Sequence, residues 1–218
     1  MNNKAYRYRL YPNSEQTILI NKTFGCVRFI YNQMLANRIT IYEQYKDDKD
    51  ALKQQTYSLP ASYKSQHEWL KELDSLTLAN AQLDLNTAYK NFFRDKSVGF
   101  PKFKRKHRDK RSYTTNNQKG SIRLIDSKTI RLPKLKDVRI KLHRQLPPNS
   151  IIKSATISQT ASGKYYIAIL VEFEAKLERI TPTVELTLGL DYLQSRSSSI
   201  VRQEVPTILD STGRRKPN

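Results

Sequence analysis

The chain has 218 residues, enough for one large domain or two small ones around an apolar core. Its 39 Lys and Arg residues outnumber 20 Asp and Glu residues, and a net charge of +19 favours a polyanionic partner. The single cysteine, Cys26, excludes an intramolecular disulfide and a cysteine-based zinc ribbon, and no apolar run could span a bilayer, so we expect a cytoplasmic protein that is neither secreted nor bound to a membrane.

The first predicted elements are a strand and a long helix. Residues 5–11 alternate apolar and basic side chains, including Arg7 and Arg9, with the period of a half-buried strand. After Pro12, Asn13 and Gln16 have the spacing of a capping box. Apolar residues then recur at helical spacing, namely Ile20, Phe24, Val27, Tyr31 and Met34. We therefore expect a helix from about residue 13 to residues 47–50.

A second helix is predicted from about residue 75 to residue 94. Its apolar stripe consists of Leu78, Ala81, Leu85, Ala88 and Phe92. Polar residues that include Asn80 lie opposite this stripe, with Gln82 beside these polar residues, and amide side chains suit adenine edges in a duplex groove. Taken alone, a solvated helix face explains these amides better.

Positive charge is concentrated between Lys90 and Arg144, where 19 basic and 4 acidic side chains give +15 of the +19. At its centre is a run of cations, Lys102, Lys104, Arg105, Lys106 and Arg108, which we call the basic run. Such cations bind phosphates and release their counterions. A soluble charged surface or contact with an anionic membrane would not explain why the cations are so concentrated in this segment. Phe100 and Phe103 either stack on bases or anchor the run to the sheet.

Neutral polar side chains fill residues 112–118. Candidates for reading base edges are Tyr113, Thr114, Thr115, Asn116 and Asn117. The same residues suit a polar turn, which is the better interpretation when they are taken alone.

From residue 121 the pattern has a period of two. Three predicted strands, near residues 122–124, 130–132 and 138–142, have an apolar face and a basic face, the latter with Arg123, Arg131, Arg139 and Lys141. Strands at 152–160 and 165–173 are joined by a turn with Gly163. We expect an α+β fold in which the first strand joins an antiparallel sheet closed into a barrel, with the helices as an insertion.

Residues 183–192 alternate as a further strand that ends at Asp191. A carboxylate there could bind a divalent cation, but one carboxylate cannot build a two-metal site, and a lone Asp after a strand is ordinarily a turn residue. His67, His107 and His143 lack the spacing of metal ligands or of a nucleophile triad.

Five segments resemble the TnpB family in their order and spacing. They are YRLYP at 8–12, FGCVRFIYN at 24–32, AYKNFF at 88–93, GFPKFK at 99–104 and LGLD at 188–191. TnpB proteins are insertion-sequence products named as transposases, linked to transposition and DNA recombination, and related to type V CRISPR effectors. The resemblance covers about residues 1–192.

The resemblance implies a wedge-type β-barrel interrupted by a helical recognition bundle and followed by a RuvC nuclease with an RNase H-like fold. We therefore expect four segments. The first barrel strand occupies 1–12, the helical bundle 13–98, the remaining barrel with the basic run 99–180, and an incomplete RuvC domain with a divergent tail 181–218.

The resemblance also implies two partners, a guide RNA from the transposon end and a target DNA with a short flanking motif, which would bring the protein to the nucleoid. The basic barrel would bind RNA backbone, whereas the helix near Gln82 and residues 114–117 would read the flanking motif. Asp191 would be the first RuvC carboxylate and a ligand of the Mg²⁺ that full-length members use for RNA-guided endonuclease activity.

Full-length relatives have a later Glu, a later Asp and a four-cysteine zinc ribbon that these 218 residues lack. We therefore expect a truncated TnpB-like protein that binds RNA and DNA, holds neither Mg²⁺ stably nor zinc, and does not cut by itself. The alternatives are a non-catalytic regulator, which blocks the full-length enzyme or nearby transcription, and a decaying gene product without activity.

Overall fold

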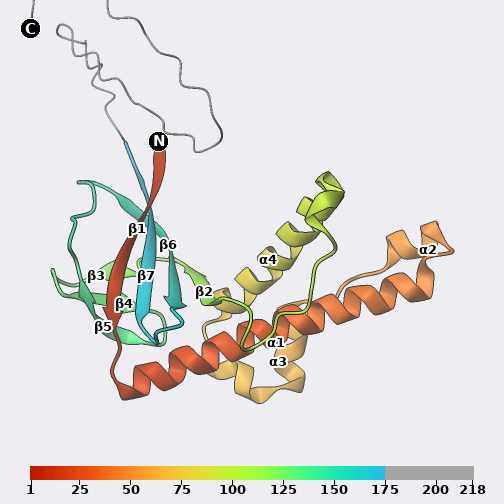
Figure 1. Cartoon of the computed structure of the whole chain (residues 1–218), viewed down its shortest axis with the longest axis horizontal. Helices are drawn as coiled ribbons and strands as arrows, with labels where there is room; N and C mark the ends of the chain where they lie inside the picture. Colours follow the sequence, from red (N-terminus) through yellow and green to blue (C-terminus); the bar gives the residue numbers. More distant parts are fainter. Residues whose placement is uncertain (175–218) are drawn as a thin grey trace, which may run out of the picture. The chain divides into compact units, whose positions relative to one another are not determined.

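The computed structural model describes residues 1–174, which belong to one compact unit. All helices lie between the first two strands, so the prediction of a helical insertion into the sheet is confirmed (Figure 1). In chain order the elements are β1 (Asn2–Tyr11), α1 (Ser14–Tyr45), α2 (Lys49–Gln54), α3 (Pro60–Gln66), η1 (Glu68–Glu72), α4 (Ser75–Arg94), η2 (Lys96–Val98), β2 (Arg111–Asn116), β3 (Arg123–Leu124), β4 (Thr129–Leu132), β5 (Lys136–Lys141), β6 (Ile151–Gln159) and β7 (Tyr165–Phe173).

Helix α1 begins with the predicted capping box. The Asn13 side chain accepts a hydrogen bond from the Gln16 backbone N–H at 2.8 Å, and the Gln16 side chain accepts one from the Asn13 N–H at 3.0 Å. All five residues of the predicted stripe are buried, but no α1 residue after Leu35 is buried. The second half of α1 and α2 therefore extend away from the strands (Figure 1).

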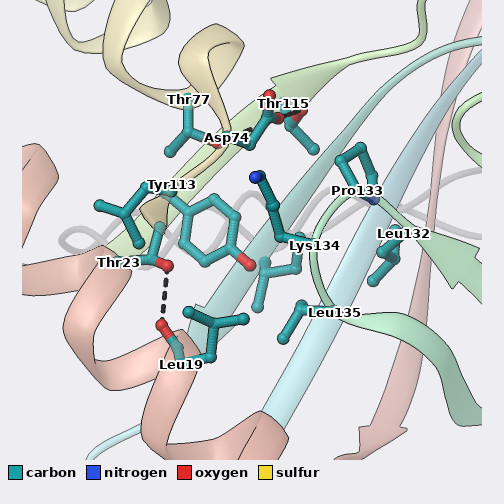
Figure 2. Close-up of a pocket in the computed structure, with 12 residues that line it drawn as sticks. Leu19, Thr23, Asp74, Thr77, Tyr113, Thr115, Leu132, Pro133, Lys134 and Leu135 are labelled. Atoms are coloured by element: carbon teal, nitrogen blue, oxygen red, sulfur yellow. Dashed lines mark hydrogen bonds between the residues drawn. The ribbon is translucent and has the colours of Figure 1, made fainter. Parts of the chain in front are cut away.

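Helix α4 has the predicted bounds and buries Leu78, Ala81 and Leu85 of its stripe. Asp74 caps it by accepting a hydrogen bond from the Leu76 N–H at 3.2 Å. The same carboxylate accepts hydrogen bonds from the hydroxyls of Thr77 and Thr115, which come from α4 and β2 (Figure 2). Asp74 thus fixes the start of the helix against the sheet.

The seven strands form one antiparallel sheet in the order β2-β6-β7-β1-β5-β4-β3. Strand β1 lies between β7 and β5, with Tyr8 opposite Ile167 and Leu10 opposite Ile140. The first strand therefore returns to the sheet formed by the distant C-terminal strands, as predicted.

The expected closure into a barrel is wrong, because within residues 1–174 the sheet is open, with β2 and β3 at its two edges. Strand β3 is only two residues long, and the loop before it is held by Asn117. The Asn117 side chain accepts from the Ile122 N–H at 2.8 Å and donates to the Ile152 carbonyl at 2.9 Å. The chain thus turns back toward β6 without forming a ladder between the edges. The wedge-type assignment stays a prediction.

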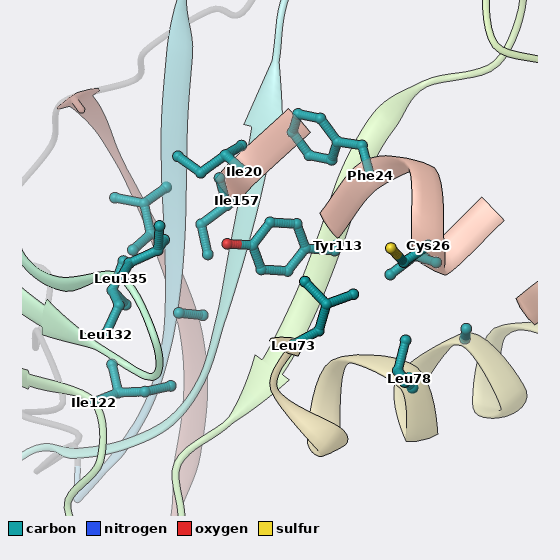
Figure 3. Packing of buried hydrophobic residues seen from close by; sticks show 14 of the residues in the cluster. Ile20, Phe24, Cys26, Leu73, Leu78, Tyr113, Ile122, Leu132, Leu135 and Ile157 are labelled. Carbon is teal, nitrogen blue, oxygen red and sulfur yellow. The ribbon is translucent and has the colours of Figure 1, made fainter. Parts of the chain in front are cut away.

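The inner face of the sheet and the first half of α1 share one core (Figure 3). Ile20 and Phe24 of α1 pack near Tyr113 of β2, with the rings of Phe24 and Tyr113 5.7 Å apart. Ile157 of β6 lies beside Tyr113. Each such buried side chain contributes about 1.5–3 kcal/mol. The core therefore ties the helices to the sheet.

Residues 112–118 do not form the turn that was preferred from sequence. Most of them belong to β2, because Tyr113 and Thr115 point inward and alternate with outward-facing polar residues. The predicted strand at 183–190 and Asp191 lie outside the described residues. No helix within residues 1–174 is long and apolar enough to cross a membrane.

Candidate nucleic-acid interface

Cations and tyrosines gather on the side of the sheet opposite the core. Cross-strand pairing places one residue from each of five strands in a row: Ser112, Ser158, Tyr166, Arg9 and Lys141. The same pairing puts Arg7 opposite Ala168, and Tyr11 opposite Arg139. We call the six charged and aromatic members the outer sheet face: Arg7, Arg9, Tyr11, Arg139, Lys141 and Tyr166.

The tyrosine rings hold the guanidinium groups of this face. The Arg7 guanidinium carbon is 4.2 Å, and that of Arg9 5.1 Å, from the ring centre of Tyr166. Tyr11 has Arg9 at 5.4 Å and Arg139 at 5.9 Å. Stacking on a ring fixes a guanidinium and leaves its N–H groups able to donate to phosphate oxygens.

None of the four cations of the outer sheet face forms an ion pair within residues 1–174. The Nη1 atom of Arg9 is moreover buried without a hydrogen-bond partner in that range. A buried donor left unpaired costs about 1–3 kcal/mol. The unpaired cations of this face make it the candidate surface for a polyanion.

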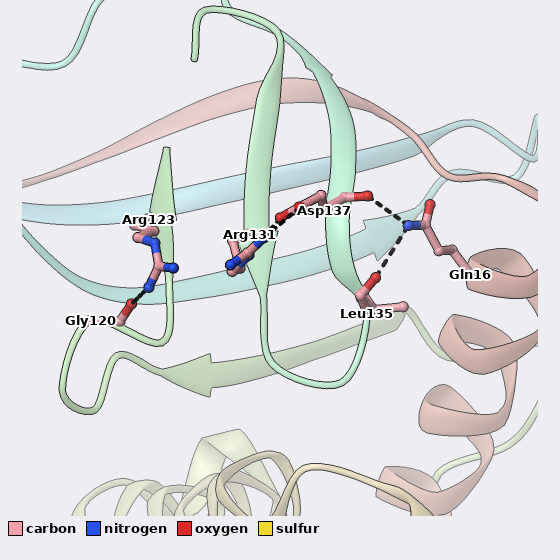
Figure 4. A network of polar contacts seen from close by, with 6 residues as sticks. All are labelled: Gln16, Gly120, Arg123, Arg131, Leu135 and Asp137. Atoms are coloured by element: carbon pink, nitrogen blue, oxygen red, sulfur yellow. Dashed lines mark hydrogen bonds and ion pairs between the residues drawn. The ribbon is translucent and has the colours of Figure 1, made fainter. Parts of the chain in front are cut away.

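The arginines at the β3–β4 edge of the sheet differ from those of the outer sheet face, because they already form hydrogen bonds within the protein (Figure 4). The Nε and Nη2 atoms of Arg131 each donate to the Asp137 carboxylate at 2.6 Å, and these hydrogen bonds lower the pKa of Asp137. Arg123 donates to the Gly120 carbonyl at 3.3 Å. Gln16 donates to the Leu135 and Asp137 carbonyls, linking α1 to β5. Arg131 therefore offers less free charge to a phosphate than sequence alone predicts.

Lys104, in the basic run, is held by α1 and α4. Its backbone N–H donates to the Asn32 side chain at 2.8 Å, and its carbonyl accepts from the same amide at 3.0 Å. Its Nζ atom lies 3.5 Å from the Asp84 carboxylate and 4.1 Å from the ring centre of Tyr31. Lys104 therefore anchors the run to the fold.

Asp109 neutralises one further cation of the run, Arg108. The Arg105 backbone N–H donates to this carboxylate, and the Arg108 Nε atom lies 3.6 Å from it. The Arg105 hydrogen bond is the main cause that lowers the pKa of Asp109. The side chains of Lys102, Arg105 and Lys106 are exposed and form no ion pair with another described residue. They are the cations of the run most available to phosphate.

Phe100 does not anchor the run to the sheet. Its ring contacts Tyr89 and Phe92 of α4, with centres 5.5 Å away in both cases. Phe103 is 46% exposed. Phe103 lines a hollow together with Phe100 and with Ile39 of α1, so both rings lie near the helices.

The candidate base-reading residues of β2 and of the loop that follows it separate into three groups. Tyr113 and Thr115 are buried, so the structure does not support nucleic-acid contacts by their side chains. Asn117 is occupied by the loop that it holds. Thr114 and Asn116 face outward, and the Thr114 hydroxyl forms a hydrogen bond with that of Thr156 at 2.8 Å.

The two candidate amide side chains of α4 differ in whether they are already hydrogen-bonded. Asn80 donates from Nδ2 to the Leu76 carbonyl at 2.8 Å, so its amide is used within its own helix. Gln82 is half-buried. The start of α4 and β2 are joined through Asp74 and Thr115, but base reading by Gln82 with Thr114 or Asn116 stays a prediction.

Sequence reasoning missed Tyr11, Tyr166 and Ser158 of this face and its row. The signal for Tyr166 was its place in β7, where it alternates with the inward residues Tyr165 and Ile167. Its importance depends on pairing with β1, which lies more than 150 residues earlier in the chain. Only the sheet topology could reveal that neighbour.

Residues 1–174 contain no group of three or more His, Cys, Asp or Glu side chains that could hold a metal ion. They therefore offer no fitting site for the Mg²⁺ that the resemblance implies. Asp191, its predicted ligand, lies outside the described residues.

Residues 1–47 match the family HTH_OrfB_IS605, described as a helix-turn-helix domain. In this structure the matched residues hold β1 and the single uninterrupted helix α1. The description therefore does not correspond here to two helices joined by a turn, and no recognition helix is inferred from it.

Three relatives are similar to the chain. A candidate RNA-guided DNA endonuclease from Streptomyces pristinaespiralis is 29% identical over 86% of this chain and 45% of its own length. InsQ from Escherichia coli K12, also named as a candidate RNA-guided DNA endonuclease, is 30% identical over 86% of this chain and 44% of its own length. The virulence protein VsdF from Salmonella dublin is 34% identical over 48% of this chain and 94% of its own length. The chain thus spans less than half the length of the first two relatives.

Proposed function

This chain belongs to the TnpB family, and we propose that its described part binds a guide RNA through the outer sheet face and contacts target DNA through α4 and β2. The observation that carries the proposal is the set of four cations on that face, which have no acidic partners within residues 1–174. Phosphate contacts supply most of the affinity for nucleic acid and need such unpaired cations.

The DNA-facing part of the proposal rests on the join between α4 and β2. Thr114 and Asn116 face outward on β2, and Gln82 is on the helix that Asp74 fixes against this strand. Hydroxyl and amide side chains are suited to base edges. We propose that this corner reads a short motif beside the target while pairing with the RNA reads the target itself.

RNA binding is tested by sequencing the RNA that co-purifies with the tagged chain, expressed beside the DNA that flanks its gene. One RNA from the transposon end should be enriched. It should be lost when Arg7, Arg9, Arg139 and Lys141 are changed to Gln. Four exposed lysines of the helical insertion, changed to Gln in the same way, provide the control: Lys46, Lys49, Lys53 and Lys71. Recovery of the same mixed cellular RNA with all three proteins would contradict the proposal.

We further propose that the 218 residues bind nucleic acid without cutting it. The resemblance assigns Asp191 as one carboxylate of the nuclease centre and gives no counterpart for the later two. The purified chain should leave a target DNA intact when guide RNA and Mg²⁺ are supplied. Cleavage that depends on Mg²⁺ and is abolished by Asp191→Asn would contradict this proposal.

A further inference from the structure

A groove lined by aromatic rings lies between the second halves of α1 and α4, apart from the outer sheet face. Its volume is about 740 Å³, and six rings line it: Tyr42, Tyr57, Tyr89, Phe92, Phe93 and Phe100. Phe93 is 68% exposed and Tyr42 54% exposed. Clusters of large, exposed apolar side chains on a protein surface usually mark a site that binds a ligand or a partner.

The rings are arranged at several angles around the groove. Tyr89 and Phe93 are stacked with an interplanar angle of 26°, whereas Phe100 meets Tyr89 at 90° and Phe92 at 81°. These ring-to-ring contacts hold the cluster in shape without filling the hollow. Exposed faces on such a rigid platform can stack on flat, aromatic ligands.

Two cations are placed over the rings. The Lys96 Nζ atom is 4.1 Å from the ring centre of Phe92, and the Arg38 guanidinium carbon is 5.0 Å from that of Tyr57. Arg38 donates to the Asn86 side chain from Nη2, but its Nε atom is buried without a partner within residues 1–174. The one acid that lines the groove, Glu43, forms an ion pair with Lys46 at 3.0 Å. The lining therefore favours a ligand that is aromatic and anionic.

The groove is continuous with the basic run. A second hollow shares Ile39 and Phe100 with it and is also lined by Lys102, Arg105 and Arg108. An unpaired strand has the matching chemistry, because its bases can enter an aromatic hollow while its phosphates follow adjacent cations. A protein segment would match the rings but would leave this charge without a partner.

We infer that this aromatic groove binds unpaired bases of a nucleic acid strand, whose backbone continues along the basic run. The inference rests on the proposed function and adds a second contact, specific for single strands, to it. Roughly two or three bases are expected, as on other aromatic platforms. The outer sheet face needs only phosphates and should bind paired and unpaired nucleic acid alike.

The test uses the full chain and an oligonucleotide that contains the fluorescent base 2-aminopurine, in single-stranded and duplex form. Tyr57→Ala and Phe93→Ala remove exposed rings, and Phe93→Trp restores a stacking surface. Trp69→Ala removes an exposed ring that does not line the groove. Dissociation constants and the quenching of 2-aminopurine are measured for each protein, and circular dichroism checks the fold.

Each alanine variant should weaken single-strand binding by roughly five- to a hundredfold and reduce quenching, while duplex binding changes less than about twofold. Phe93→Trp and Trp69→Ala should bind as the unchanged chain does. Unchanged single-strand binding by folded alanine variants would overturn the inference. If the alanine variants bind normally but the variant of the outer sheet face loses RNA, the proposed function stands and only the groove inference fails. If the unchanged chain binds no nucleic acid, both the proposed function and the groove inference are contradicted.

Discussion

The outer sheet face and the basic run both concentrate positive charge, but the fold uses their cations differently. In the run, Lys104 is fixed by Asn32 and Asp84, and the Arg108 guanidinium pairs with Asp109, whose carboxylate also accepts from the Arg105 backbone N–H. On the outer sheet face the three arginines contact tyrosine rings instead of carboxylates. The density of charge along the sequence therefore does not rank the surfaces by their capacity to bind phosphate.

The two surfaces also have different roles in the fold. The basic run connects the helical insertion to the sheet, so part of its charge is needed for structure. The outer sheet face is supported from behind by the core, because its residues alternate with Tyr8, Leu10 and Ile167. Its side chains can therefore be changed with little cost in stability.

The largest expected effect comes from changing Arg7, Arg9, Arg139 and Lys141 together to Gln. Losing four phosphate contacts should lower RNA affinity on the order of a hundredfold at physiological salt and reduce the slope of log K against log salt by about 3. Filter binding across a salt series measures both. The four helical lysine changes, with the same loss of net charge, should move either quantity far less; an equal loss there would mean that only total charge matters.

The second prediction concerns how the basic run is held. Asn32→Ala removes both hydrogen bonds to the Lys104 backbone and should lower the free energy of unfolding by about 2 kcal/mol. Thermal or urea unfolding measures the loss. Asn37→Ala is the matched control, because Asn37 accepts one hydrogen bond from the Ser58 N–H and should cost about half as much. A change no larger than in the control would show that the run is not tethered through Asn32.

A smaller loss of RNA affinity is expected when two of the unpaired cations of the run are removed. Changing Lys102 and Lys106 to Gln should weaken RNA binding roughly three- to tenfold, since two phosphate contacts are lost, and should leave stability unchanged. Filter binding and thermal unfolding are measured on the same samples. If this pair costs as much affinity as the four outer-face changes, the order of the two surfaces is reversed.

The smallest expected effect is a gain in RNA affinity when an acidic residue at the edge of the sheet is neutralised. Asp137→Asn removes the negative charge that neutralises Arg131 and one of its two acceptor oxygens, and should tighten RNA binding about twofold. Asp126→Asn makes the same charge change in the turn before β4, where the carboxylate accepts from the Lys128 N–H and holds no arginine. Equal gains in RNA affinity in both variants would mean that the change in net charge alone strengthens binding, without a specific contribution from the Arg131 guanidinium.

Sequence periodicity predicted the local elements well. The bounds of α4, the capping box of α1 and the strands β4 to β7 were predicted from local patterns, in which the residues that matter lie only a few positions apart in the sequence. The return of β1 to the sheet was also predicted, because a strand without a neighbour in sequence must pair elsewhere.

What sequence could not supply depends on side chains far apart in the chain. The open edges of the sheet follow from the loop that Asn117 holds, and the pairing of Arg131 with Asp137 follows from the turn between β4 and β5. Strand β2 was missed because polar residues dominate its outward face, although Tyr113 and Thr115 alternate inward. The outer sheet face itself joins residues from both ends of the described chain.

The most direct test of the outer sheet face is ultraviolet crosslinking of the co-purified RNA to the full chain, followed by mass spectrometry of the crosslinked peptides. Tyrosines in contact with RNA crosslink to it, so the account predicts adducts on Tyr166 of β7 and Tyr11 of β1. Adducts confined to residues 99–110, with none on β1 or β7, would contradict it and would place the RNA on the basic run.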